Sequence, residues 1–316
     1  MSGAAESVLR SGRASRPVEV SIVMPCFNSE RTLAGCLDAL RRQRFTLFEI
    51  VMVDSSPGGE CEAIVRERYP EVRYEHSPRK LLPHAARNRG AEAAVGELLV
   101  FSDPDTYARP DWVEKLVAHH RATSHIIVGA LACFGRQWID LGNHLCKFSK
   151  WLPGGAPRSV DNAPTANLLC PHAVFDRLGR FDGENLHGDT TFSWKAREHG
   201  HVLWFAPDAI VFHHHLQRVG DVVRERHSRG VLFGELRADL WSNRRSKLLL
   251  YLLVSLLPVR LLRVLALTVA HCRRGRCLID LAATHPLVVL GHGAALLGES
   301  RAYARRLIAR RPQGGT

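Results

Sequence analysis

Two aspartates separated by one proline, Asp103 and Asp105, directly follow the apolar run at 98–101. Carboxylate oxygens at the end of a strand are hard ligands that suit Mg²⁺ or Mn²⁺, usually alongside the phosphates of a substrate. Asp and Pro are also common turn residues, so the same residues could form a turn that leads into a helix. The pair therefore indicates a metal site only if other polar residues gather at the same place.

The segments around this pair repeat a strand–helix unit. Strand-like apolar runs lie at 20–27, 48–53, 72–75, 98–101, 202–205 and 209–212, and helical patterns begin near Ser29, Cys61, Ala85, Pro110 and Thr191. Such repeats predict an α/β fold with a mostly parallel sheet covered by helices on both faces. Ligands bind beyond the carboxyl ends of such strands, where Asn28, Asp54 and the two aspartates fall. The stretch 137–160 shows no clear pattern.

Seven short motifs occur in order along this part of the chain: VSIVMPCFN (20–28), Asp54, ARNRG (86–90), GELLVFSDPD (96–105), LGRFD (178–182), GDTTFSW (188–194) and PDAIVFH (207–213). In this order and spacing the chain resembles the family 2 glycosyltransferases. The resemblance implies the GT-A fold, with its Rossmann-like sheet, and an inverting enzyme that uses a nucleotide sugar and a divalent metal. Gly188 departs from the family, which often has an acidic residue there.

The resemblance also implies a donor site formed by Pro25, Asn28, Asp54, Arg87 and Asp103. Asn28 and Asp54 would hold the base and the ribose, and the carboxylate of Asp54 would accept a uracil-type N–H, which favours a UDP-linked donor. Arg87 would contact the diphosphate, because a guanidinium suits phosphate oxygens. A solvated arginine on a helix explains Arg87 equally well.

For catalysis, the resemblance makes Asp189 the base that takes the proton of the acceptor hydroxyl. The same residue could cap the helix predicted at 191–198. Asp105 and His213 would hold Mn²⁺ or Mg²⁺. Strand alternation places His213 and His215 on one face and His214 on the other, so only one face can reach the metal. The acceptor would lie near Asn167 and Trp194, although Trp194 also fits core packing.

The charge of the chain is concentrated at its end. The net charge is +12, and the residues after His215 hold 18 Lys and Arg against 6 Asp and Glu. The apolar segments 248–272 and 278–298 are interrupted by charges and proline, so neither is a clean membrane span. Basic clusters flank both segments, at 244–247, 273–276 and 301–311. These features predict helices in an anionic membrane interface, and the alternative is a helical subdomain packed on the core.

Composition limits the remaining classes. With 46% hydrophobic and 23% charged residues, the chain is typical of a globular protein and not of a disordered, collagen-like or polytopic one. Eight scattered cysteines favour reduced thiols in the cytoplasm. We expect a flexible leader at 1–17, a GT-A domain at 18–215 and a basic helical region at 216–316. The protein would lie on the inner face of the cell membrane and act on a glycan or lipid-linked acceptor.

Two other functions compete with this interpretation. A nucleotidyltransferase could use a similar sheet and similar carboxylates, but it would release pyrophosphate. A nucleic-acid-binding protein would explain a calculated pI of 9.8, but its positive charge should alternate with exposed aromatic residues. In this chain the charge alternates with Leu and Val, so we expect a lipid surface and no nucleic acid.

Overall fold

The computed structural model describes residues 17–215, 218–241 and 244–308. Nine strands form one sheet: β1 Val20–Cys26, β2 Phe48–Asp54, β3 Arg73–His76, β4 Leu98–Ser102, β5 Thr106–Ala108, β6 Ile126–Cys133, β7 Arg158–Val160, β8 Asn167–Pro171 and β9 Leu203–His213. Their order is β3-β2-β1-β4-β8-β6-β9-β5, and β7 pairs with β9. The four strands predicted in the first hundred residues are confirmed within one or two residues of each end.

The sheet is mixed. β3, β2, β1 and β4 are parallel, as are β6 and β9, whereas β8 runs antiparallel between β4 and β6. β5 and β7 are also antiparallel to β9. The parallel half brings the ends of β1, β2 and β4 to one edge of the sheet, which is the arrangement that the apolar runs predicted.

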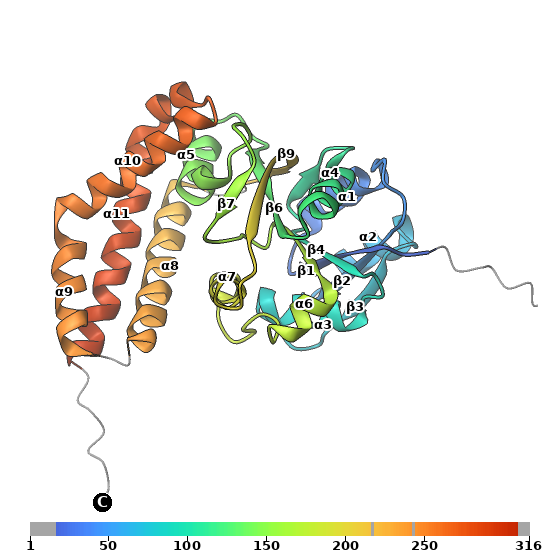
Figure 1. Ribbon diagram of the computed structural model, residues 1–316, viewed down its shortest axis with the longest axis horizontal. Coiled ribbons are helices and arrows are strands. Elements are labelled where there is room, and N and C mark those ends of the chain that lie inside the picture. Colours follow the sequence, from blue (N-terminus) through green and yellow to red (C-terminus); the bar gives the residue numbers. More distant parts are fainter. Residues whose placement is uncertain (1–16, 216–217, 242–243, 309–316) are drawn as a thin grey trace, which may run out of the picture.

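Helices cover both faces of the sheet (Figure 1). They are α1 Glu30–Arg41, α2 Glu60–Arg68, α3 Pro83–Ala93, α4 Trp112–Thr123, α5 Trp138–Phe148, α6 His172–Arg177 and α7 Gly188–Glu198, with a 3₁₀ turn at Ser149–Trp151. One core cluster joins the sheet to α1, α2 and α4, for example through Leu37 and Trp112. The other joins it to α3, α6 and α7, through Ala91, Phe175 and Phe192. Each cluster buries the apolar side of its helices.

Two parts of the sequence fold differently from the prediction. The runs at 202–205 and 209–212 form a single strand, β9. The partner strand shifts register between Gly129 and Ala130, and the amide of Asn167 donates to Ala130 O and Ala209 O at 2.9 and 3.0 Å. These bonds occupy backbone carbonyls that the irregular ladder would leave unpaired. The stretch 137–160 was not assigned, and it holds α5, the 3₁₀ turn and β7.

The last four helices form a layer beside the sheet domain: α8 Val219–Leu240, α9 Arg245–Leu256, α10 Pro258–Arg274 and α11 Leu278–Ile308. α11 lies between α8 and α9 and also packs on α5, where Cys146 and Val288 share a buried cluster. The helices α8 and α11 touch through their backbones. A Cβ on Gly230 would lie 2.0 Å from Ala295 O, and one on Gly298 would lie 2.1 Å from His227 O. The tail is therefore packed on the core, as one of the two alternatives predicted.

Length and hydropathy distinguish α11 from the other C-terminal helices. Among the described residues, α11 alone is long and apolar enough to cross a membrane, and half of its most apolar window is buried in the protein. Helices α9 and α10 pass the same test only as a pair, and they are bent by 69°.

We predict that Gly230→Ala lowers the free energy of unfolding by about 1–3 kcal/mol, because the new methyl group would force α8 away from the α11 backbone. Gly293→Ala is the matched control. It lies in the same helix pair, its Cβ would meet nothing within 4 Å, and it should stabilise the helix by about 0.5–1 kcal/mol. Urea unfolding of both variants tests this. Equal effects of the two substitutions would show that the close contact does not matter.

Candidate functional site

A cleft of about 790 Å³ opens at the carboxyl ends of β1 and β4. Helix α8 forms its opposite wall. Seven of the eight predicted site residues line it: Pro25, Asn28, Arg87, Asp103, Asp105, Asp189 and His213. Motifs that are far apart in the sequence therefore meet in one place, because strand ends and the helices that follow them converge there.

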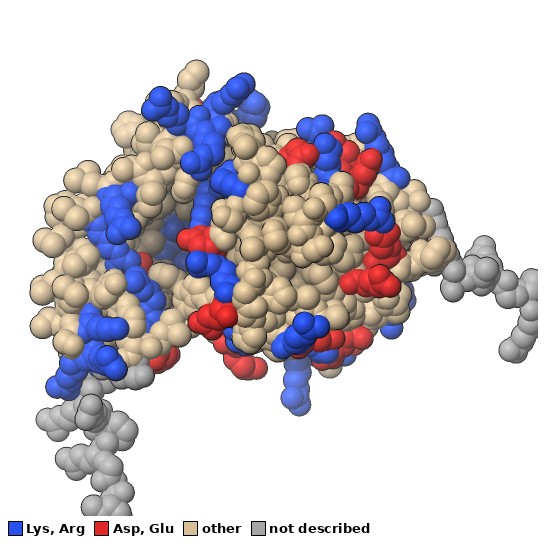
Figure 2. Space-filling view, viewed as in Figure 1, with Lys and Arg blue, Asp and Glu red and all other residues tan. Residues whose placement is uncertain are grey.

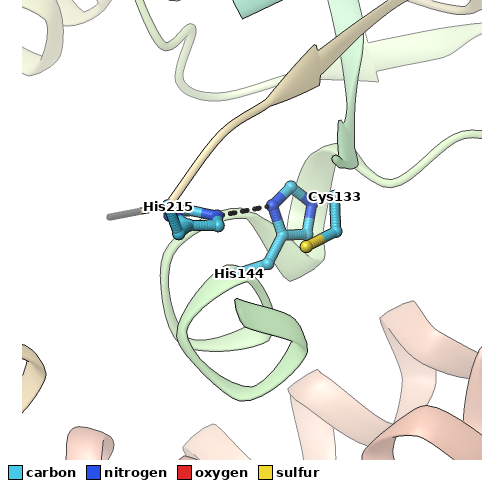
Figure 3. A group of neighbouring side chains, drawn as sticks. All are labelled: Cys133, His144 and His215. Atoms are coloured by element: carbon cyan, nitrogen blue, oxygen red, sulfur yellow. Dashed lines mark hydrogen bonds between the residues drawn. The ribbon is translucent and has the colours of Figure 1, made fainter. Parts of the chain in front are cut away.

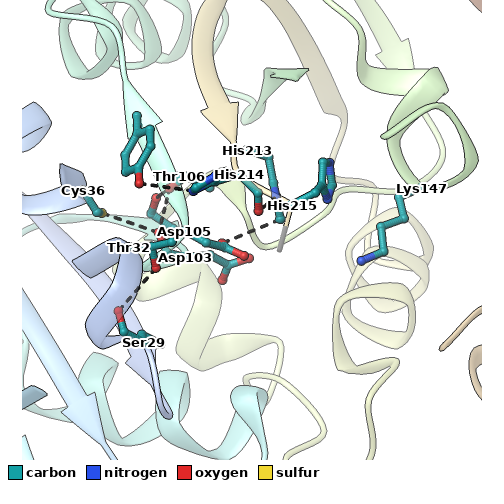
Figure 4. Close-up of polar contacts among 12 residues, drawn as sticks. Ser29, Thr32, Cys36, Asp103, Asp105, Thr106, Lys147, His213, His214 and His215 are labelled. Carbon is teal, nitrogen blue, oxygen red and sulfur yellow. Dashed lines mark hydrogen bonds and ion pairs between the residues drawn. The ribbon is translucent and has the colours of Figure 1, made fainter. Parts of the chain in front are cut away.

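Asp103, Asp105 and His213 form a cluster whose ligand atoms all lie within 4.8 Å of one another. Asp105 Oδ1 lies 3.7 Å from His213 Nε2, is buried, and accepts no hydrogen bond from the described residues. Figure 4 shows both carboxylates turned toward the same space, with Lys147 pointing into it from the other side. Burial and the neighbouring Asp103 raise the pKa of Asp105, and His213 opposes this shift. An orphaned carboxylate oxygen beside an imidazole fits a hard divalent cation.

Arg87 belongs to the cleft and is not a solvated helix residue. Pro83 begins α3, and one turn later the guanidinium of Arg87 is buried and paired with the carboxylate of Asp103. Its exposed fraction is only 3%, and its Nε has no partner in the described part of the chain. A buried guanidinium with an unused donor on a cleft wall suits a phosphate oxygen.

Asp54 is placed differently from the other predicted residues. It is wholly buried and does not line the cleft. Its Oδ1 accepts from Ser56 N and Oγ at 2.8 and 2.5 Å, and its Oδ2 accepts from Tyr74 Oη at 2.7 Å. Ser56 Oγ in turn accepts the backbone N–H of Asn28, a residue held at φ 48°. In this structure Asp54 therefore fixes the turn that positions Asn28.

Asp189 lies in the first turn of α7 and faces the cleft. The helix cap is His187, so the prediction that Asp189 is the N-cap is wrong. The carboxylate accepts from Thr190 N at 2.7 Å. Burial raises the pKa of Asp189, while Arg229 and Arg87 act in the opposite direction. A carboxylate with a raised pKa in a cleft is suited to accept a proton.

The three histidines at the end of β9 separate as strand alternation predicted. His213 and His215 stack at 4.7 Å, and His214 turns away to pack on Phe134. Asn143 and His144, both from α5, support His215. Its Nε2 lies 3.1 Å from His144 Nδ1, and the other ring nitrogen of His144 donates to Leu131 O at 3.1 Å.

Cys133 completes a second group of neighbouring side chains with His144 and His215 (Figure 3). Burial lowers the pKa of both imidazoles, to about 3 for His144. The two neutral imidazoles form a continuous hydrogen-bonded chain that runs from His215 through His144 to the backbone carbonyl of Leu131. The group therefore explains how His215 is held beneath His213 without any ligand.

Comparison with known proteins agrees with this geometry. Residues 21–174 match the model of Glycosyl transferase family 2. These residues form a family 2 glycosyltransferase domain. About two thirds of the chain has the fold of GT-A glycosyltransferases: TarS 1–349 of S. aureus superposes with a TM-score of 0.51 at 18% identity, covering 66% of this chain and 64% of that one. A structure of GalNAc-T7 with UDP, GalNAc and Mn²⁺ gives 0.52 at 18% identity, covering 64% and 44%.

Curated relatives agree at modest identity. Glycosyltransferase AglE of Haloferax volcanii is 25% identical over 203 residues, which is 61% of this chain and 66% of that protein. Validoxylamine A glucosyltransferase of Streptomyces hygroscopicus is 30% identical over 229 residues, or 60% and 54%. The chain thus spans between about half and two thirds of the length of these relatives.

Helix α8 adds to the cleft two residues that the sequence did not reveal as site residues. Arg226 and Arg229, one turn apart, line the cleft. Neither forms an ion pair with a carboxylate of the described residues, because Glu225 pairs with Lys147 and Glu299 with Arg260. The signal in the sequence was the excess positive charge after His215, which we assigned to a membrane surface alone.

The two predicted acceptor residues do not reach the cleft. Asn167 is wholly buried, and its amide bonds to Trp112, Ala130 and Ala209 hold the irregular part of the sheet. Trp194, on α7, is half-buried and is also absent from the cleft lining.

We predict that the family 2 domain binds Mn²⁺ and that Asp105→Asn weakens this binding by more than about tenfold. Removing a residue that only orients a metal ligand already lowers metal affinity by about tenfold or more, and Asp105 is proposed as a ligand itself. The free Mn²⁺ signal in electron paramagnetic resonance measures the affinity directly. Asp221→Asn, on the exposed start of α8, changes the net charge equally and should bind as the wild type does. Equal loss in both variants would indicate only a general charge effect.

Proposed function

We propose that this protein is an inverting, metal-dependent glycosyltransferase. It moves a sugar from a UDP-linked donor to a hydroxyl of a glycan or lipid-linked acceptor. The observation that carries the proposal is the meeting of Asp103, Asp105 and His213 with Asp189 in one cleft of a family 2 domain. Similar structures that contain UDP-GlcNAc, or UDP with GalNAc and Mn²⁺, support the donor class and the cation.

The donor would lie along the β1 side of the cleft. Pro25 and the side chain of Asn28 lie at the end of β1, where the nucleoside would bind on the turn that Asp54 fixes. Arg87 would hold the diphosphate with its unused Nε donor, while its ion pair keeps Asp103 in place. Each of these groups orients the donor and none of them reacts.

Asp105 and His213 would hold Mn²⁺ or Mg²⁺, with Asp103 beside them, and the cation supplies positive charge to the leaving diphosphate. Asp189 accepts the proton of the acceptor hydroxyl while that oxygen forms a bond to the anomeric carbon. The bond from that carbon to the diphosphate oxygen breaks, and its electron pair leaves with UDP. Attack from the face opposite the leaving group inverts the configuration, and the proton remains on Asp189 until solvent takes it.

The acceptor would enter between α7 and α8, since Asp189 lies on one side of this opening and Arg226 and Arg229 on the other. Two guanidiniums that form no ion pair with a carboxylate of the described residues favour an acceptor that carries negative charge. Helices α9 and α10 expose an apolar surface that includes Leu250, Leu253, Leu256, Leu257, Val259 and Leu262, each more than half exposed. An anionic bilayer on the cytoplasmic side of the cell membrane fits this surface and its flanking arginines.

Asp189→Asn tests the proposed reaction. We expect UDP release from a UDP-sugar in the presence of acceptor to fall by about 10²–10⁴-fold, the usual contribution of a general base. The melting temperature should not fall, because a partly buried carboxylate is replaced by a neutral group of the same shape. The chain is assayed with Mn²⁺ and a panel of nucleotide sugars. Full activity of Asp189→Asn with every donor that the wild type uses would contradict the assignment.

The pH dependence provides a second prediction. The pKa of Asp189 is raised, so its carboxylate form, and with it kcat/KM, is lost as pH falls through that raised pKa. Arg229 lowers this pKa, and Arg229→Ala should therefore move the acid limb of the kcat/KM profile to higher pH. Arg224→Ala removes an exposed arginine of the same helix that pairs with Asp221 and should leave the limb in place. If the acid limb of the kcat/KM profile stays at the same pH in Arg229→Ala, then Arg229 does not influence the pKa of the catalytic base.

A further inference from the structure

A second pocket, of about 660 Å³, lies outside the cleft and shares no lining residue with it. It is bounded by the 3₁₀ turn with β7, by the end of α7 and by the end of α10. Its basic lining residues are Lys150, Arg158, Arg197, His201, His271 and Arg274, and Asp161 is its one acidic lining residue. Basic side chains gather over this end of α10 in Figure 2.

Close backbone packing fixes the two sides of this pocket. The loop after the 3₁₀ turn contains Gly154 and Gly155 with φ of 106° and 75°, a conformation that other residues rarely adopt. A Cβ on Gly155 would lie 3.0 Å from Cγ of Arg274, and one on Gly275 would lie 3.0 Å from Cβ of Leu152. The loop and the end of α10 therefore touch, and the arginines of both are brought to the same hollow.

The charges in this pocket are not balanced within the described residues. Asp161 pairs with Lys150 and is largely exposed, whereas Arg158, Arg197 and Arg274 form no ion pair with a described residue. Arg158 stacks on Phe205 at 4.3 Å and donates from Nη2 to Lys150 O at 3.2 Å, but its Nη1 is buried without a partner. Burial and the adjacent Arg274 lower the pKa of both Arg158 and His271. Like charges held together in this way cost free energy unless an anion joins them.

We propose that Arg158, Arg197 and Arg274 form a binding site for a phosphate group, separate from the sugar-transfer cleft. A phosphate dianion would accept hydrogen bonds from several guanidinium groups and would supply the partner that Nη1 of Arg158 lacks. The same chemistry is offered by free phosphate and by the headgroup of an acidic phospholipid. The inference does not depend on the proposed function.

The position of Arg274 relates the site to the apolar surface. On α10, Leu267 and Arg274 are seven residues apart and thus on one face of the helix, and Leu267 is half exposed. A phospholipid whose acyl chains contact this face would carry its phosphate to the level of the pocket. We therefore test the site with an acidic phospholipid as well as with free phosphate.

The experiment uses the full chain with two exposed pocket arginines replaced singly, Arg197→Ala and Arg274→Ala. The matched control is Arg273→Ala, an exposed residue of the same helix that does not line the pocket. Calorimetric titration with inorganic phosphate forms one arm. Co-sedimentation with phosphatidylcholine vesicles, with and without phosphatidic acid, forms the other. We expect each pocket variant to weaken binding about tenfold, the loss of one hydrogen bond to a charged group, and the control to bind as the wild type does.

Loss in the titration identifies free phosphate as the ligand, and loss only with phosphatidic acid identifies a headgroup; either result supports the site. Binding by Arg197→Ala and Arg274→Ala that equals the control in both arms overturns it. Melting temperature confirms that each variant is folded. Mn²⁺ binding at the cleft is measured on the same samples and should be unchanged, so a failure of the proposed phosphate site is distinguished from a failure of the sugar-transfer site.

Discussion

The carboxylates in the cleft repel one another, and basic side chains from several elements must offset that repulsion. Three carboxylates, from Asp103, Asp105 and Asp189, share one partly buried space, where like charges repel strongly and burial disfavours ionisation. Arg87 and Arg229 offset this cost for Asp189, and Arg87 pairs directly with Asp103. Asp105 lies near His213 and Lys147, but its Oδ1 is buried and accepts no hydrogen bond from a described residue. The proposed metal position is therefore next to this carboxylate oxygen of Asp105, to which no basic side chain of the described residues donates a hydrogen bond.

Helix α8 supplies part of this balance, and its position is set by α11. The backbones of these helices approach so closely at Gly230 and Gly298 that no larger residue fits without movement. Because α11 also packs on α5, the same contact connects the wall that bears Arg229 to the helix that supports His215. The C-terminal helices are therefore part of the site and not an appendage of the sheet domain.

The sequence predicted those parts of the structure that local pattern determines. Long apolar strands and the polar residues at their ends located β1, β2 and β4 with Asn28, Asp103 and Asp105, because strand direction brings those ends together. The family resemblance, and not strand direction, supplied Pro25, Arg87, Asp189 and His213. Distant contacts determined the rest. Gly142 interrupts the pattern of α5, yet a Cβ there would lie 2.8 Å from Leu287, which belongs to a helix near the end of the chain. Asp54 follows its strand as the donor-site pattern requires, but Tyr74, from the neighbouring strand, takes one of its oxygens. Neither contact has a signature in the local sequence.

The positive charge of the C-terminal helices was interpreted as a membrane-binding feature, and the structure shows that some of these arginines have other surroundings. An excess of arginine between apolar segments predicted contact with an anionic surface, and exposed leucines on α9 and α10 remain available for it. Yet Arg226 and Arg229 face the cleft, and Arg274 faces a second pocket. Arg226 and Arg229, which line the cleft, are shielded from a bilayer, so the apolar area of α9 and α10 would supply most of the membrane affinity. The arginines that face the two pockets would then bind phosphates and other anionic groups of individual molecules. Net charge alone does not distinguish these arginines from those that would face a membrane.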